Sequence, residues 1–262
     1  MKLINSYIQE KLVINKDSKI KPKYSCQPQT KRELQKIIIE RLKKDKNADL
    51  NDIDVSKITD MSELFDKDEI LINFNADISQ WDVSNVTDMS GMFGGGENFN
   101  CDISNWDISN VKDISWIFFN CKNFNQDLSK WNTSKLEVAR SAFEGCLNFV
   151  GKGLGKWNVS HLKDCVKMFK DDPKFNEDIS NWDVSNVRKF RSMFYGCTKF
   201  NQDISQWDIQ HARSISYMFY KCKSFNYDLS SWDEPNNCMY YENTFAETQY
   251  PDKYKPKWLL NV

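Results

Sequence analysis

The sequence predicts an α/β solenoid of about seven to eight 25-residue repeats, each a short strand and a short helix, between N- and C-terminal caps. The first observation behind this prediction is a set of tryptophans spaced 25 or 26 residues apart: Trp81, Trp106, Trp131, Trp157, Trp182, Trp207 and Trp232. The second is that two short apolar patterns return between these tryptophans. Neither pattern is long enough to bury its apolar side alone, so we expect neighbouring repeats to stack and to share one core.

The ends of the chain are expected to close this stack. On this prediction one structural domain has three parts: an N-terminal cap at residues 1–52, the repeats at 53–245 and a C-terminal capping segment at 246–262. In the N-terminal cap, Thr30 followed by Glu33 is a capping-box pattern. Apolar residues follow at helical spacing: Leu34, Ile37, Ile38 and Leu42. We expect a helix over about residues 31–44, with its apolar face on the first repeat, and we expect Trp258 to cover the last one.

The first repeated pattern begins eight residues after each tryptophan. Met89, Met92, Phe93 and Gly96 have the spacing of one face of a two-turn helix. Similar apolar or small residues occupy the same columns in later repeats: Ile114, Ile117, Phe118, Cys121; Phe190, Met193, Phe194, Cys197; Ile215, Met218, Phe219, Cys222. An aspartate stands before this face in several repeats, where a helix N-cap belongs: Asp60, Asp88, Asp113 and Asp164.

The second pattern, Phe-Asn-x-Asp-Ile-Ser-x-Trp, predicts a brief strand and a corner. Its asparagines recur in one column: Asn75, Asn100, Asn125, Asn176, Asn201 and Asn226. We expect these amides to bond backbone groups from one repeat to the next. The aspartates of the pattern are expected to accept backbone N–H groups at the corners, with calcium binding as the alternative.

Four cysteines share one repeat position: Cys121, Cys146, Cys197 and Cys222. Free cysteine packs as a small apolar residue, and we expect that role here. Disulfides or metal-bound thiolates are the alternative.

Together these columns resemble the bacterial leucine-rich-repeat family of the BspA type. The likeness is to its 25-residue variant, which is found in surface proteins and mycoplasma-type lipoproteins. The matching pattern is Trp-Asp-Val-Ser-x-Val-x-x-Met-x-x-Met-Phe-x-x-Cys-x-x-Phe-Asn-x-Asp-Ile-Ser, over roughly residues 53–245, and residues 142–146 match the Ala-Phe-x-x-Cys core of the shorter repeat. The resemblance implies a right-handed leucine-rich-repeat-like solenoid that binds proteins or host surfaces, with no catalytic residues to carry over.

The repeat is irregular in residues 136–172. Residues 150–156, Val-Gly-Lys-Gly-Leu-Gly-Lys, replace the Asn-x-Asp-Ile-Ser motif, and their spacing differs from that of a phosphate-binding loop. We expect a bulge or an outward loop there. If one repeat is specialised for binding, this region is the candidate.

No catalytic motif, cofactor motif or metal-ligand spacing stands out, so we expect a non-enzymatic protein-interaction scaffold without cofactor or metal. Polar residues vary from repeat to repeat at two positions that we expect to face solvent, and these are the candidate partner-binding residues: Gln80, Asn105, Lys130, Lys156, Asn181, Gln206, Gln126, Glu177, Gln202 and Tyr227. The alternatives are a cell-surface adhesin that binds glycans or host proteins, and an effector or enzyme with a site in residues 136–172.

The formal net charge of -1 gives no overall attraction to nucleic acid. No apolar run approaches the length of a membrane span, and the first seven residues lack a secretory apolar region. We therefore expect a protein partner, no nucleic acid, no membrane insertion and a cytoplasmic location, with the cell surface or non-classical secretion as the alternative. The partner's identity and the oligomeric state stay open.

Overall fold

The computed structural model describes residues 12–14, 20–46, 48–65 and 69–260. The remaining part of the expected N-terminal cap lies outside the described residues. The regular elements are few, and most lie near the ends of the chain: β1 (Leu12–Ile14), β2 (Ile20–Pro22), α2 (Lys31–Lys44), α3 (Glu69–Ile72) and the 3₁₀ turns η1 (Leu154–Lys156), η2 (Asp252–Tyr254) and η3 (Lys257–Leu259). β1 and β2 form an antiparallel pair in which Val13 lies opposite Lys21.

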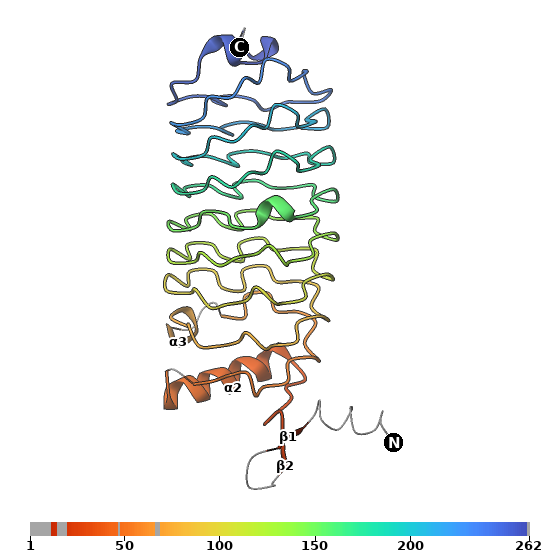
Figure 1. The fold of residues 1–262 in the computed structure, drawn as a ribbon, viewed down its shortest axis with the longest axis vertical. Coiled ribbons are helices and arrows are strands. Elements are labelled where there is room, and N and C mark those ends of the chain that lie inside the picture. The colour runs from red at the N-terminus through yellow and green to blue at the C-terminus, as the bar shows by residue number, and fades with distance from the viewer. Residues whose placement is uncertain (1–11, 15–19, 47, 66–68, 261–262) are drawn as a thin grey trace.

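The repeats form irregular rungs that stack one on another from α2 to the C-terminal end (Figure 1). We call each repeat of 25 or 26 residues a rung. Single parallel bridges join equivalent residues of successive rungs, in the series Asp60, Asp88, Asp113, Val138, Asp164, Lys189, Ser214 and Tyr240. The stacking that the period predicts is therefore present.

The predicted strand and short helix of each repeat are absent in the described residues, so an α/β leucine-rich-repeat-like solenoid is wrong as the fold class. Residues 89–96, expected to be helical, form successive turns instead. Met92 N–H donates to the carbonyl of Met89, and Gly96 N–H to that of Phe93. Gly91 and Gly95 have φ values of 62° and 80°, and a positive φ at the third residue is the mark of a type II turn. Two such turns bring apolar residues to one side at the same three- and four-residue spacing as a helix.

Hydrogen bonds between rungs explain why these turns replace the helix. Alternate N–H groups of each rung donate to carbonyls of the next: Met89 to Asp113, Gly91 to Ser115, Phe93 to Ile117 and Gly95 to Phe119, at 2.6–3.1 Å. These alternate N–H groups therefore point toward the C-terminal end of the stack, and the carbonyls that accept them point toward the N-terminal end. The neighbouring rung supplies the hydrogen bonds that a helix would make within itself.

The aspartates that precede this segment bond locally rather than capping helices. Asp88 Oδ1 accepts the N–H of Ser90 at 2.8 Å, and Asp113 Oδ1 accepts that of Ser115 at 2.7 Å. Each aspartate closes a turn over two residues, which is the Asx pattern.

In the Phe-Asn-x-Asp-Ile-Ser segments, asparagine side chains link successive rungs in place of the backbone hydrogen bonds of a β-ladder. Asn100 Oδ1 accepts the N–H of Asn125 at 2.9 Å, and Asn176 Oδ1 accepts that of Asn201 at 2.8 Å. This confirms the predicted role of the asparagine column. Carboxylates at the corners accept the N–H of a serine two residues later, as Asp127 does from Ser129 at 2.9 Å.

These corner bonds lower the pKa of several aspartates, and that of Asp127 falls to about 2, chiefly through the Ser129 N–H. A carboxyl whose pKa is lower in the folded than in the unfolded chain stabilises the fold above about pH 4, and that contribution is lost as the pH falls toward the folded value. We expect thermal stability to drop between about pH 4 and pH 2. Asp127→Asn keeps an acceptor, as Asn132 does for Ser134, and is expected to flatten part of this drop. Calorimetric melts of both chains at pH 5, 3.5 and 2 test this, and superimposable pH profiles would count against it.

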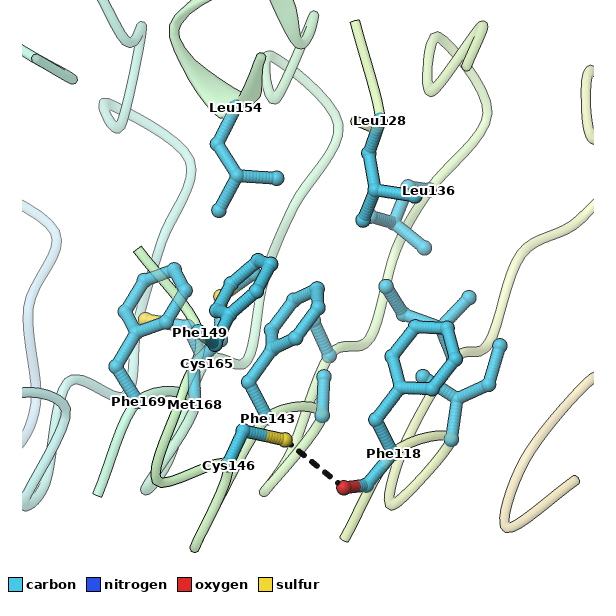
Figure 2. Close-up of a cluster of buried hydrophobic side chains, with 14 of the residues drawn as sticks. Phe118, Leu128, Leu136, Phe143, Cys146, Phe149, Leu154, Cys165, Met168 and Phe169 are labelled. Atoms are coloured by element: carbon cyan, nitrogen blue, oxygen red, sulfur yellow. Dashed lines mark hydrogen bonds between the residues drawn. The ribbon is translucent and has the colours of Figure 1, made fainter. Parts of the chain in front are cut away.

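The core consists of stacked columns of phenylalanine, tryptophan and cysteine. Trp81 and Trp106 stack with ring centroids 6.4 Å apart, and Trp106 Nε1 donates to the carbonyl of Ile78 at 3.2 Å. The four column cysteines are fully buried and free, which confirms their predicted role. Figure 2 shows Cys146 beside the phenylalanine rings, with its thiol donating to the carbonyl of Phe118 at 3.0 Å.

Helix α2 covers the first rung, as the sequence predicts. It spans Lys31–Lys44, with Thr30 Oγ1 accepting the N–H of Glu33, and it buries Leu34, Ile38 and Leu42. Lys31 Nζ donates to the carbonyl of Ser62 at 2.8 Å, and Gln35 Nε2 to that of Leu64 at 3.0 Å. The helix therefore takes up carbonyls that a preceding rung would otherwise bond.

Residues 150–156 form a packed bulge, so the outward-loop alternative is wrong. Leu154 is fully buried, and Glu177 Oε1 accepts the N–H of Gly153 at 2.9 Å. Gly153 has a φ of 91°, and a Cβ there would lie 2.4 Å from the backbone nitrogen of Ser129. Glycine is required because the backbones of two rungs approach closely at this point.

Candidate binding surface

The candidate residues that directly precede the tryptophans all face solvent: Gln80, Asn105, Lys130, Lys156, Asn181 and Gln206. Asn181 Nδ2 donates to the carbonyl of Gly155 in the preceding rung at 2.9 Å, whereas Lys130 and Gln206 bond neighbouring side chains. Lys130 Nζ reaches Asn105 Oδ1 at 2.6 Å, and Gln206 Nε2 reaches Ser205 Oγ at 3.3 Å. The structure thus places these six residues in one exposed column.

The second candidate column is mostly engaged in holding the rungs together. Gln126 and Gln202 are half-buried, and their amides donate to the carbonyls of Asn100 and Asn176 at 2.7 and 2.8 Å. Glu177 holds the bulge described above. Tyr227, at 38% exposed, is the most open of the four. We therefore regard this column chiefly as part of the frame.

A different part of the rungs forms a hollow of about 510 Å³, which lies outside both candidate columns. Residues from five successive rungs line it: Asp113, Ser115, Trp116, Val138, Arg140, Lys163, Asp164, Arg188, Lys189 and Arg213. We call this the basic hollow, because five of its ten lining residues are cationic and two are acidic.

One buried carboxylate anchors the floor of the basic hollow. Asp164, 5% exposed, accepts from Arg140 Nε and Nη2 at 2.8 and 2.6 Å, and Lys189 Nζ lies 3.0 Å from the same oxygen. At the rim, Lys163 Nζ contacts Glu137 at 2.5 Å and lowers the pKa of that carboxyl. These three cations are therefore already paired.

Arg188 and Arg213 stand exposed at the rim without such a partner. Neither guanidinium forms an ion pair with any residue that the structure describes. The backbone N–H of Arg213 donates to the carbonyl of Arg188 at 2.8 Å, and that of Arg188 to Lys163 at 2.9 Å, so the three side chains start from adjacent rungs. Like charges this close repel one another, and an acidic ligand would relieve that repulsion.

Trp116 borders the basic hollow at its N-terminal side. It is 47% exposed and has a φ of 56°, a conformation that is uncommon for a bulky residue. Gly91 holds the equivalent position one rung earlier, with a φ of 62°. Trp116 also borders a second hollow of about 390 Å³ whose lining includes Gly94, Gly95 and Phe119. The indole therefore stands between a charged hollow and a more apolar one.

The sequence does carry a signal for the basic hollow. Lys163, Arg188 and Arg213 each stand six residues after a column tryptophan, at Trp157, Trp182 and Trp207. Such a charged column is visible once the repeats are aligned, but its meeting with Trp116 and Arg140 depends on how the rungs stack.

Groups of three or more histidine, cysteine or acidic residues placed to hold a metal ion are absent from the described residues. Within the same part of the chain, none of the helices has the length and apolar character needed to cross a membrane.

Comparison with known proteins gives one family. The family described as "Mycoplasma protein of unknown function, DUF285" matches residues 38–152 and again residues 139–258. The two matches overlap at the irregular centre. The comparison with curated proteins and the comparison with solved structures found no match. The resemblance to BspA-type leucine-rich repeats stays a prediction.

Proposed function

The chain belongs to the DUF285 family, and on that premise we propose that it is a non-enzymatic protein-interaction scaffold that binds an acidic protein surface at the basic hollow. One observation carries the proposal. Trp116, Arg188 and Arg213 border a single hollow of about 510 Å³, with the indole exposed and both guanidinium groups unpaired among the described residues. Tryptophan and arginine are the residue types that dominate binding energy in protein interfaces.

The exposure of Trp116 supports a binding role for its side chain. Its left-handed backbone conformation belongs to the frame, because the equivalent residues Lys167 and Ser192 of other rungs adopt it too. The indole itself is half exposed, so the fold gains little from burying it. A bulky aromatic side chain held on such a turn is a suitable anchor for a partner.

The charges around the basic hollow favour a protein over a nucleic acid. Asp113 and Asp164 line the same hollow, and Glu137 lies against Lys163. A continuous phosphate backbone would meet these carboxylates together with the cations. An acidic protein segment places its carboxylates individually, so it can contact Arg188 and Arg213 without approaching Asp113.

The test compares variants of the intact chain as bait in an extract of the producing cell, with bound proteins counted by mass spectrometry. Arg188→Gln with Arg213→Gln is expected to lower recovery of a partner at least tenfold, since two charged contacts at about 1.5–3 kcal/mol each would be lost. Trp116→Gly is expected to weaken binding similarly while leaving thermal stability equal or higher, because glycine adopts the backbone conformation without strain. Gln206→Ala is the matched exposed control and is expected to bind normally.

Two results would contradict the proposal. Equal recovery by all baits would mean that the basic hollow is not the binding surface. Loss of the bound material on nuclease treatment would mean that nucleic acid, rather than protein, is the ligand.

A further inference from the structure

We propose that the C-terminal rung accepts an extended, basic segment of another protein as an additional rung. The contact would be made by the backbone N–H groups of Tyr241, Asn243, Phe245 and Glu247, which we call the donor row. No residue of the donor row lines the basic hollow, so this surface is separate from the one described above.

The preceding rung shows what the donor row is shaped to bind. There the equivalent N–H groups each donate to a carbonyl of the last rung: Ile215 to Tyr240, Tyr217 to Glu242, Phe219 to Thr244 and Lys221 to Ala246, at 2.8–3.2 Å. The natural ligand of such a row is therefore a polypeptide backbone that presents carbonyls at alternate residues.

The last rung repeats the same backbone conformation. Asn243 and Glu247 have φ values of 56° and 57°, and their counterparts Tyr217 and Lys221 have values of 57° and 59°. Nevertheless, the four N–H groups of the donor row find no acceptor in the described part of the chain. Unpaired edges of this kind are known sites for the addition of a strand from a partner.

Space for a further segment is present beside the donor row. Residues 241–246 line a hollow of about 450 Å³ together with Lys255 and Leu259. The C-terminal segment packs next to this hollow: Tyr250 stacks on Phe245 at 4.5 Å, and Trp258 Nε1 donates to the carbonyl of Trp232. The segment thus covers the end of the core and leaves the donor row open.

An exposed aromatic side chain lies at the start of the donor row. Tyr240 is 54% exposed, whereas its counterpart Ser214, which is followed by another rung, is 9% exposed. A segment laid along the donor row would cover part of Tyr240, and this burial would add to the hydrogen bonds.

A second copy of this chain does not fit the donor row. Two C-terminal ends would set N–H groups against N–H groups. The N-terminal end has suitable carbonyls, but those of Ser62 and Leu64 are taken by Lys31 and Gln35 of α2. With a second copy excluded, we take the occupant to be a segment of a different protein.

Charge selects a basic occupant. Glu242 and Glu247 are exposed along the donor row, and Lys255 at the hollow is already paired with Asp252 at 2.6 Å. These carboxylates repel polyanions and attract lysine or arginine side chains.

The probe is a synthetic peptide with the sequence of residues 187–197, with serine in place of its cysteine. In the intact protein this basic stretch presents such a carbonyl row, in which the carbonyls of Lys189 and Arg191 accept from Cys165 and Lys167. Titration into the ¹⁵N-labelled full chain is expected to shift the four amides of the donor row saturably and to slow their hydrogen exchange at least fivefold. The amides of Ile215, Tyr217, Phe219 and Lys221 serve as internal controls that stay unchanged.

Glu242→Lys with Glu247→Lys is expected to weaken peptide binding at least fivefold without unfolding the chain, because both side chains are exposed. Glu97→Lys, at an exposed carboxylate on a distant rung, is the control and should bind as wild type. The proposal is overturned if millimolar peptide leaves the donor row unshifted, if the shifts cluster elsewhere, or if a peptide with glutamate in place of every Lys and Arg binds as tightly.

Discussion

Replacing Phe200 with alanine is expected to lower the free energy of unfolding by about 3–5 kcal/mol, because a buried aromatic ring is lost and a cavity remains. The ring is fully buried and lies between Phe175 and Phe225, each at 5.7 Å, with Phe194 at 4.1 Å. Truncation therefore weakens both inter-rung contacts of a central rung. In a stacked repeat array stability depends on such nearest-neighbour contacts, so the effect should spread beyond the altered rung.

Gln206→Ala provides the matched comparison, six residues along the same repeat. Its side chain is exposed and donates one hydrogen bond, to Ser205 Oγ, so we expect a change of less than about 0.5 kcal/mol. Urea denaturation of both variants beside the wild type measures the two values. Similar small losses in both would show that the phenylalanine column does not hold the rungs together.

Replacing Asp172 with cysteine is expected to stabilise the chain by about 1–3 kcal/mol at neutral pH, the usual cost of a buried polar group without a partner. Asp172 occupies the cysteine column between Cys146 and Cys197 and is fully buried. Its Oδ1 accepts the N–H of Cys146 at 2.7 Å, but its Oδ2 has no hydrogen-bond partner among the described residues. Cysteine fills this column in neighbouring rungs without such a cost.

The contribution of Asp172 to stability should depend on pH in the direction opposite to that of the corner aspartates, so the stability gained by Asp172→Cys should depend on pH as well. Burial raises the pKa of Asp172 well above its usual range. The folded chain then holds a proton that the unfolded chain releases above about pH 4, so stability falls as the pH rises from that point. The advantage of Asp172→Cys should accordingly shrink as the pH is lowered to about 4. Asp172→Asn keeps the shape and removes the titration, and it should abolish the same slope.

Urea melts at pH 4, 5.5 and 7 measure both effects. A cysteine variant that is less stable than wild type at pH 7 would mean that the Asp172 side chain has a stabilising role in the folded chain.

The sequence was sufficient to predict the period, the buried columns and helix α2, because each depends on a regular spacing of side chains. Phe200 and Cys197 face inward in a stack of helices and in a stack of turns alike. The spacing of Met89, Met92 and Phe93 does not distinguish the two, because two type II turns reproduce it. The turns depend on left-handed residues such as Trp116 and Lys167, which carry no glycine signal.

The basic hollow was harder to predict because it exists only between rungs. Arg140 and Asp164 are 24 residues apart and meet through stacking, at 2.6 Å. The position of the donor row likewise depends on which end of the stack leaves its N–H groups unpaired. The repeat period and the composition do not determine the direction of the N–H groups, because that direction follows from the backbone conformation of the turns.

Photo-crosslinking from a single position tests most directly the claim that the partner binds at the basic hollow. A photoreactive phenylalanine analogue is introduced at position 116 in one chain and at position 206 in another, and each chain is irradiated in an extract of the producing cell. We expect a discrete protein adduct from position 116 that disappears in high salt and in the chain that also carries Arg188→Gln and Arg213→Gln. An adduct from position 206 alone would contradict the claim and would place the partner on the exposed polar column that precedes the tryptophans.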